Sequence, residues 1–311
     1  MSELQPVTRA EIVSPNRRRW ISAVLATTSL FALQNSAPDP RPDLPPETKI
    51  VAMGDSYTSG HADGQVDGIY EDCFRHEVSY ANQIASQLDI VDFSNVACSG
   101  ASPEEVINGR FGQASQLDSL DEATDYVLMT TGANVTNLSD LLEICMTSDC
   151  NTDNRDIAAV FESLRSDDFR NRLTSTYQAV LEAAPSASLI VVGYPSVIDT
   201  GAFCGTLVRE DVDDFVMKFV AGLNGAIAGA VESVAKEGSA IYYSEPPSDI
   251  DICRSLGRAF HHDLDNPRAI GHPTAMGHQA MADSVLRTMA GVRQTELAAL
   301  DRRSEMMAAE D

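Results

Sequence analysis

The chain has 311 residues, of which 43% are hydrophobic, a size that fits one large α/β domain with extensions at its ends. Its formal net charge of -24 repels nucleic acid and anionic lipid headgroups, so we expect neither as a main partner. We also expect no stable protein partner and a monomeric state.

Residues 1–37 have the pattern of an export segment. Arg17, Arg18 and Arg19 form a positive region, and a mostly apolar run of 13 residues follows from Ile21 to Leu33. Such a run is short for a membrane span but typical of a signal-peptide core, so we expect a secreted protein. An uncleaved N-terminal anchor is the alternative. Residues 38–48 are rich in proline and predict an extended linker.

Five short apolar runs predict the strands of a parallel sheet that is covered on both faces. The runs are Lys49–Ser56, Ile90–Ala97, Tyr126–Thr131, Ser188–Tyr194 and Ala240–Ser244. Helical spacing of apolar residues lies between and after them, at 80–88, 173–181, 215–231 and from Pro273 onward. This alternation predicts an α/β fold with a doubly wound sheet, in which a functional site lies at the carboxyl ends of the strands. The main domain is expected over 49–292, and the charged tail 293–311 is expected to prolong the last helix.

Six cysteines follow the export segment, and none of them forms a C-x-x-C pair. An even number behind such a segment favours disulfides over metal or redox sites. Pairing in chain order is the simplest hypothesis: Cys73–Cys98, Cys145–Cys150 and Cys204–Cys253.

Four polar or small residues lie at the predicted functional edge. Ser56 follows the first strand, Gly100 the second and Asn134 the third, and His272 precedes the last helix. A serine hydroxyl needs an adjacent base to act as a nucleophile, and a tetrahedral oxyanion needs fixed donors. His272 is the candidate base, while the N–H groups of Ser56 and Gly100 and the Asn134 amide are the candidate donors. The alternative for Ser56 is a turn serine that caps the following helix.

These segments resemble the sequence blocks of the GDSL/SGNH hydrolase family. Gly54-Asp55-Ser56-Tyr57 matches the first block, Gly100 the second, Gly132-Ala133-Asn134 the third and His272-Pro273 the last. The matches come in the family's order and span residues 50–290. The chain is similar to the secreted actinobacterial lipase/esterase branch in three features: Cys73-Phe74-Arg75, Gly193-Tyr194-Pro195 and the six cysteines.

The resemblance implies a flavodoxin-like three-layer α/β/α sandwich with a five-stranded parallel sheet. It also implies hydrolysis of small-molecule or lipid esters through an acyl-enzyme on Ser56, without metal or organic cofactor. The chain departs from the family at Val135, where an acid is usual, and at Ala269, where many relatives carry the aspartate that orients the histidine. Because members of the secreted branch use a main-chain carbonyl instead, we predict that the Ala269 carbonyl orients His272. Asp263 and Asp265 are the alternatives.

Other interpretations fit the same sequence. On the same scaffold the protein is alternatively a carbohydrate deacetylase, a phospholipase, or a binding module without catalysis. A cluster of histidines and acids around the last block has no standard metal-ligand spacing, and we predict no metal site there. Its members are His261, His262, Asp263, Asp265, His272 and His278. His278 is predicted to be a packing or hydrogen-bonding histidine.

Overall fold

The computed structural model describes residues 41–61, 73–135, 145, 150, 153–197, 209–248, 250–251, 258–261 and 269–310. The chain divides into two units, Met1–Asp39 and Pro40–Asp311, and all described residues belong to the second. The predicted export segment therefore lies outside the described residues. So do Cys204, Cys253, Asp263 and Asp265.

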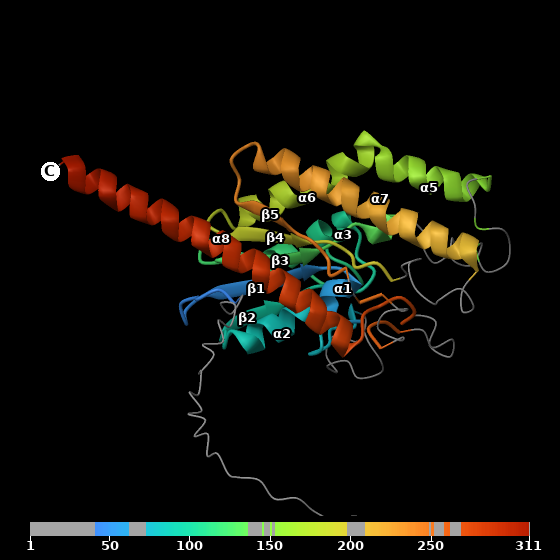
Figure 1. Ribbon diagram of the computed structural model, residues 1–311, viewed down its shortest axis with the longest axis horizontal. Coiled ribbons are helices and arrows are strands. Elements are labelled where there is room, and N and C mark those ends of the chain that lie inside the picture. The colour runs from blue at the N-terminus through green and yellow to red at the C-terminus, as the bar shows by residue number, and fades with distance from the viewer. Residues whose placement is uncertain are drawn as a thin grey trace, which may run out of the picture. The chain divides into compact units, whose positions relative to one another are not determined.

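Five parallel strands form one sheet in the order β2-β1-β3-β4-β5 (Figure 1). They are β1 (Lys49–Gly54), β2 (Asp92–Asn95), β3 (Tyr126–Thr130), β4 (Ser188–Val192) and β5 (Ile241–Ser244). All five predicted strands are present, although their ends differ from the prediction by one or two residues. This order is flavodoxin-like, and its switch point lies where β1 and β3 pair side by side.

Helices cover both faces of the sheet. On one face α2 (Tyr80–Gln87) and α8 (Ala275–Glu310) pack on Ile50 and Ala52 of β1 and on alternate residues of the neighbouring strands. On the other face Met53 and Met129 meet α3 (Pro103–Asn108), α6 (Asp167–Ala183) and α7 (Glu210–Ala235). Helix α5 (Arg155–Arg165) packs against α6 and α7. The predicted three-layer α/β/α sandwich is confirmed.

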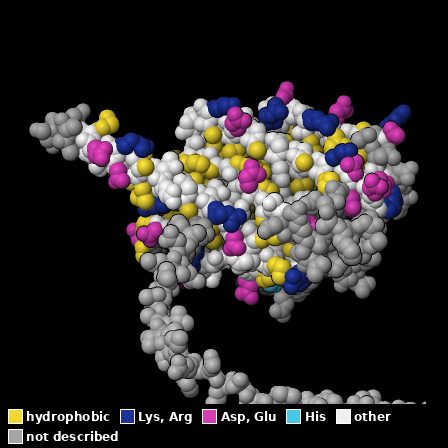
Figure 2. Space-filling model, in the orientation of Figure 1, with side chains coloured by type: hydrophobic (Ala, Val, Ile, Leu, Met, Phe, Trp, Pro, Cys, Tyr) yellow, Lys and Arg dark blue, Asp and Glu magenta, His cyan; other side chains and the backbone are white. Residues whose placement is uncertain are grey.

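Helix α8 begins at Ala275, close to the predicted start, and runs to Glu310. Its first half is buried against the sheet as far as Val292, whereas Leu297, Leu300 and Met307 are exposed. Figure 1 shows this second half extending past the sheet, and Figure 2 shows basic and acidic side chains interspersed along it. The charged tail thus prolongs the last helix.

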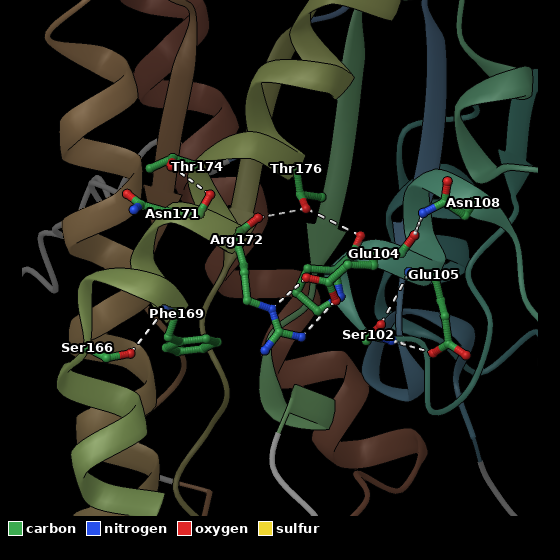
Figure 3. Close-up of polar contacts among 11 residues, drawn as sticks. Ser102, Glu104, Glu105, Asn108, Ser166, Phe169, Asn171, Arg172, Thr174 and Thr176 are labelled. Atoms are coloured by element: carbon green, nitrogen blue, oxygen red, sulfur yellow. Dashed lines mark hydrogen bonds and ion pairs between the residues drawn. The ribbon is translucent and has the colours of Figure 1, made fainter.

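Helix α3 is fixed at its N-terminus and against α6 (Figure 3). The Ser102 hydroxyl accepts from the Glu105 N–H, and the Glu105 carboxylate accepts from the Ser102 N–H, which forms a capping box. Arg172 of α6 donates to both carboxylate oxygens of Glu104, at 2.6 and 2.8 Å. Because α3 starts just after Gly100, these contacts also restrain the Gly100 loop.

Two predicted disulfides are confirmed. Cys73–Cys98 joins the segment before α2 to the loop after β2, and Cys145–Cys150 joins two residues that are five positions apart. The third predicted pair lies outside the described residues.

Candidate active site

The turn after β1 presents Ser56 as the first residue of the short helix α1 (Ser56–Ser59). Gly54 makes this turn possible, because a Cβ there would lie 2.0 Å from the Thr130 carbonyl oxygen and its φ is +119°. The Asp55 side chain caps α1 by accepting from the Tyr57 N–H. Asp55 rather than Ser56 therefore performs the capping, and the Ser56 hydroxyl is left for another contact.

That contact is with His272. The distance between His272 Nε2 and Ser56 Oγ is 2.8 Å, although the two residues are 216 positions apart in the chain. A hydroxyl and an imidazole at this distance are placed for proton transfer from oxygen to nitrogen.

Backbone hydrogen bonds hold the His272 loop in place. His261 donates its N–H to the His272 carbonyl and accepts from the Gly271 N–H, each at 2.9 Å. Phe260 and Pro273 form an antiparallel bridge beside them. The Ala269 carbonyl accepts the backbone N–H of His272 at 2.9 Å. The residue predicted to orient His272 thus lies next to it, in the turn that shapes this loop.

Tyr57 connects the nucleophile turn to the same loop. Its hydroxyl donates to the Gly271 carbonyl at 2.8 Å, and its ring centroid lies 5.5 Å from that of His272. Burial is the main cause that raises the pKa of Tyr57 above its usual value, followed by the nearby Asp55 carboxylate, so the hydroxyl stays a donor. The two halves of the serine–histidine pair are therefore joined by a second, partly buried contact.

Two of the predicted oxyanion donors have no acceptor among the residues that the structure describes. Within the described residues, the N–H groups of Ser56 and Gly100 donate no hydrogen bond. The Asn134 amide nitrogen donates to the Ala101 carbonyl at 3.2 Å and to the Asp55 carboxylate at 3.4 Å. Asn134 thus lies beside the residue that precedes Ser56, as expected where the ends of β1 and β3 meet.

Asp55 is a buried carboxyl directly before Ser56. It is fully buried, and desolvation raises its pKa from 3.8 to about 7, against the opposing hydrogen bonds from the Tyr194 hydroxyl and the Tyr57 N–H. Tyr194 donates a hydrogen bond to Asp55 and accepts from the Ala133 N–H at 3.1 Å. This network ties the loops after β1, β3 and β4 together under Ser56.

His278 has no part in these contacts. It is fully buried at the start of α8, and neither ring nitrogen forms a hydrogen bond within the described residues. Burial lowers its pKa to about 3, so the ring is neutral at physiological pH. It is a packing residue, one of the two roles that the sequence predicts.

Sequence reasoning assigned no role to Asp55, Tyr57, Tyr194 or His61. The first three lie inside the sequence motifs that resemble those of the family, and this position was the available signal of a role. His61 follows Gly60 at the end of α1, and its ring stacks on that of His272. No sequence pattern indicates that two histidine rings stack, because the contact depends on how the backbone turns back towards the site after α1.

Comparisons with known proteins show the family of the chain. The model of the GDSL-like Lipase/Acylhydrolase family matches residues 52–280. A lipase from Streptomyces rimosus is 30% identical over 62% of this chain and 69% of its own length. Lipase 2 from Streptomyces coelicolor is 24% identical over 88% of this chain and 97% of its own.

Solved structures are similar in fold. The phospholipase A1 from Streptomyces albidoflavus NA297 has a TM-score of 0.65 and 28% identity, over 78% of this chain and 98% of that one. The extracellular lipase from Streptomyces rimosus has a TM-score of 0.63 and 25% identity, over 78% and 99%.

A five-stranded parallel sheet with a serine and a histidine in contact at its carboxyl edge defines an α/β/α ester hydrolase. The chain belongs to the GDSL-like lipase/acylhydrolase family, in its actinobacterial branch.

Proposed function

We propose that Ser56 is the nucleophile and His272 the general base of a carboxylic ester hydrolase. The observation that carries the proposal is the 2.8 Å contact between Ser56 Oγ and His272 Nε2. His272 takes the Ser56 proton as Oγ attacks the ester carbonyl, and the imidazolium then protonates the leaving alcohol. Water attacks the resulting acyl-enzyme with His272 again as base, which releases the acid and restores Ser56.

The oxyanion is stabilised by the N–H groups of Ser56 and Gly100 and by the Asn134 amide. The two backbone donors support this role because they have no acceptor within the described part of the chain. The Asn134 amide exchanges its long contacts with Ala101 and Asp55 for the oxyanion. Loss of one such donor typically costs about 10²- to 10³-fold in rate.

The substrate is proposed to be a lipid or small carboxylic ester that the protein meets outside the cell. Support comes from the lipases and the phospholipase A1 to which the chain is similar. The two disulfides favour an oxidising compartment, in agreement with the predicted export segment. Phospholipid hydrolysis is the second candidate, favoured by the likeness to the phospholipase A1.

Ser56→Ala tests the nucleophile. We expect the variant to lose at least about 10³-fold in kcat, because it removes the hydroxyl that contacts His272 Nε2. The assay uses p-nitrophenyl esters from acetate to palmitate, phosphatidylcholine and acetylated xylan. A fluorophosphonate probe should label the wild type at Ser56 and leave Ser56→Ala unlabelled. Wild-type turnover in a folded variant contradicts the assignment, and wild-type protein that neither labels nor hydrolyses favours a binding module.

We further propose that the Ala269 carbonyl accepts a second hydrogen bond, from His272 Nδ1, and so fixes the tautomer. The carbonyl already accepts the His272 backbone N–H, and a carbonyl oxygen has a second lone pair. Asp263→Asn and Asp265→Asn test this proposal. Each variant should keep kcat within about threefold of wild type, whereas loss of an orienting carboxylate costs about 10⁴-fold. A loss of that size in either folded variant assigns the role to the aspartate.

A further inference from the structure

His61 lies against the proposed base at the centre of the site. Its ring centroid is 4.6 Å from that of His272, and the two ring planes differ by 22°, which is a stacked arrangement. A second aromatic neighbour is Phe74, with a centroid distance of 4.7 Å. His61 is 8% exposed, so the ring is enclosed rather than displayed to solvent.

The backbone delivers His61 to this place through the nucleophile's own turn. The N–H groups of Gly60 and His61 both donate to the Ser56 carbonyl at 3.1 Å. Gly60 has a φ of +81°, and a Cβ there would lie 2.7 Å from the Ser79 Cβ. Only glycine fits this sharp return, so the position of His61 is set by the same turn that presents Ser56.

A side-chain contact connects His61 to the loop that carries an oxyanion donor. His61 Nδ1 lies 2.9 Å from Ser99 Oγ, and Ser99 directly precedes Gly100. The Ser99 N–H donates to the Cys73 carbonyl, and Cys73 is bonded to Cys98. One face of His61 thus rests on the base, while its edge is held by a loop that the disulfide restrains.

We propose that His61 is a positioning residue that fixes the ring plane of His272 and aligns it with Ser56 Oγ. The inference rests on the proposed function, because it concerns the base of that reaction. A hydrogen bond at Nε2 leaves the imidazole free to tilt about the N–O direction, and a stacked ring removes that freedom. Since a misplacement of about 1 Å costs about 10²-fold in rate, such a restraint acts on kcat.

Three variants test the role. His61→Ala removes the stacked ring, His61→Phe keeps an aromatic plane without Nδ1, and Phe161→Ala is the matched control. Phe161 is 7% exposed and packs on Phe215 between α5 and α7, away from Ser56. Each folded protein is assayed for kcat and KM, and for the rate at which a fluorophosphonate labels Ser56, which needs no bound ester.

We expect His61→Ala to lower kcat and the labelling rate by about 10- to 100-fold with KM within about threefold of wild type. His61→Phe should recover most of kcat and of the labelling rate. Phe161→Ala should lower the stability of the protein but leave kcat and the labelling rate unchanged. Wild-type rates in His61→Ala overturn the inference, and so does His61→Phe as slow as His61→Ala. Failure of the proposed function is separate, because Ser56 would then not label even in the wild type. If His61→Ala does not fold, two variants replace it: His61→Phe, and Ser99→Ala, which removes the contact to His61 Nδ1. A wild-type rate in Ser99→Ala together with a slow, folded His61→Phe then overturns the inference.

Discussion

Asp55 illustrates how a single buried acid contributes to both stability and the site. Burial raises its pKa from 3.8 to about 7, so the folded protein holds this proton over a pH range in which the unfolded chain has released it. By linkage, the unfolding free energy contributed by Asp55 falls as the pH rises between about 4 and 7. The difference between the two pKa values corresponds to about 4 kcal/mol as an upper bound.

Asp55→Asn removes this titration. Relative to wild type, we expect the variant to gain stability as the pH rises from about 4 to 7, because asparagine pays no cost of ionisation. Urea unfolding at several pH values measures the difference. Asp167→Asn is the control, since the Asp167 side chain is 89% exposed. A gap between Asp55→Asn and wild type that is constant with pH contradicts the assignment.

At the residue scale, the sequence predicts which residues lie at the candidate site better than it predicts which side chains contact each other. Ser56, Gly100, Asn134 and His272 were located because each follows a strand or precedes a helix, and parallel strands bring such positions to one edge. The roles of Tyr57 and His61 depend on side-chain direction. A tyrosine hydroxyl that reaches the Gly271 carbonyl across 214 positions leaves no pattern in the chain.

Among the elements, the pair formed by α3 and α6 shows how a helix outside the sheet supports the Gly100 loop (Figure 3). Donation from Arg172 is the main cause that lowers the pKa of Glu104 from 4.5 to about 2. A lowered pKa stabilises the fold at pH values above 4.5, and this contribution is lost as the pH falls towards 2.

Glu104→Gln tests the contact between the helices. We expect a loss of at most about 1 kcal/mol of unfolding free energy at pH 7, because the pair is partly exposed and screened by solvent. The difference from wild type should shrink as the pH falls from about 4.5 to 2. Chemical unfolding across this range measures it, with Glu232→Gln in the exposed i,i+4 pair with Lys236 as the control. A loss at pH 7 that persists undiminished at pH 2 contradicts the ion-pair explanation.

The elements themselves were predictable where apolar residues repeat over several turns. Helices α6, α7 and α8 have such repeats, whereas α3 has six residues and too little length for a period. No helix was predicted there, although the capping-box pattern from Ser102 to Glu105 is a signal for the start of a helix. Helix α5 buries Ile157, Phe161 and Leu164, whose helical spacing in the sequence is sufficient to predict it.

For the whole molecule, the alternation of strands and helices predicts the class of fold but leaves the strand order open. Pairing of β1 with both β2 and β3 is a long-range property, and it is this pairing that brings the loops after the three strands to one edge. The resemblance to a family supplied the order that periodicity alone does not. Two of the three predicted disulfides are confirmed for a different reason, because cysteines behind an expected export segment have few alternative uses.

The long separation between Ser56 and His272 also has a consequence for biosynthesis. A ribosome adding about 5–20 residues per second delivers the imidazole about 10–40 s after the hydroxyl. Until the start of α8 has docked on the sheet, the nascent chain holds an alcohol with no partner to activate it. On the proposed roles of Ser56 and His272, hydrolytic competence is therefore acquired in one late step, and a cut that detaches the C-terminal helix with its preceding loop removes the proposed base while leaving Ser56 in place.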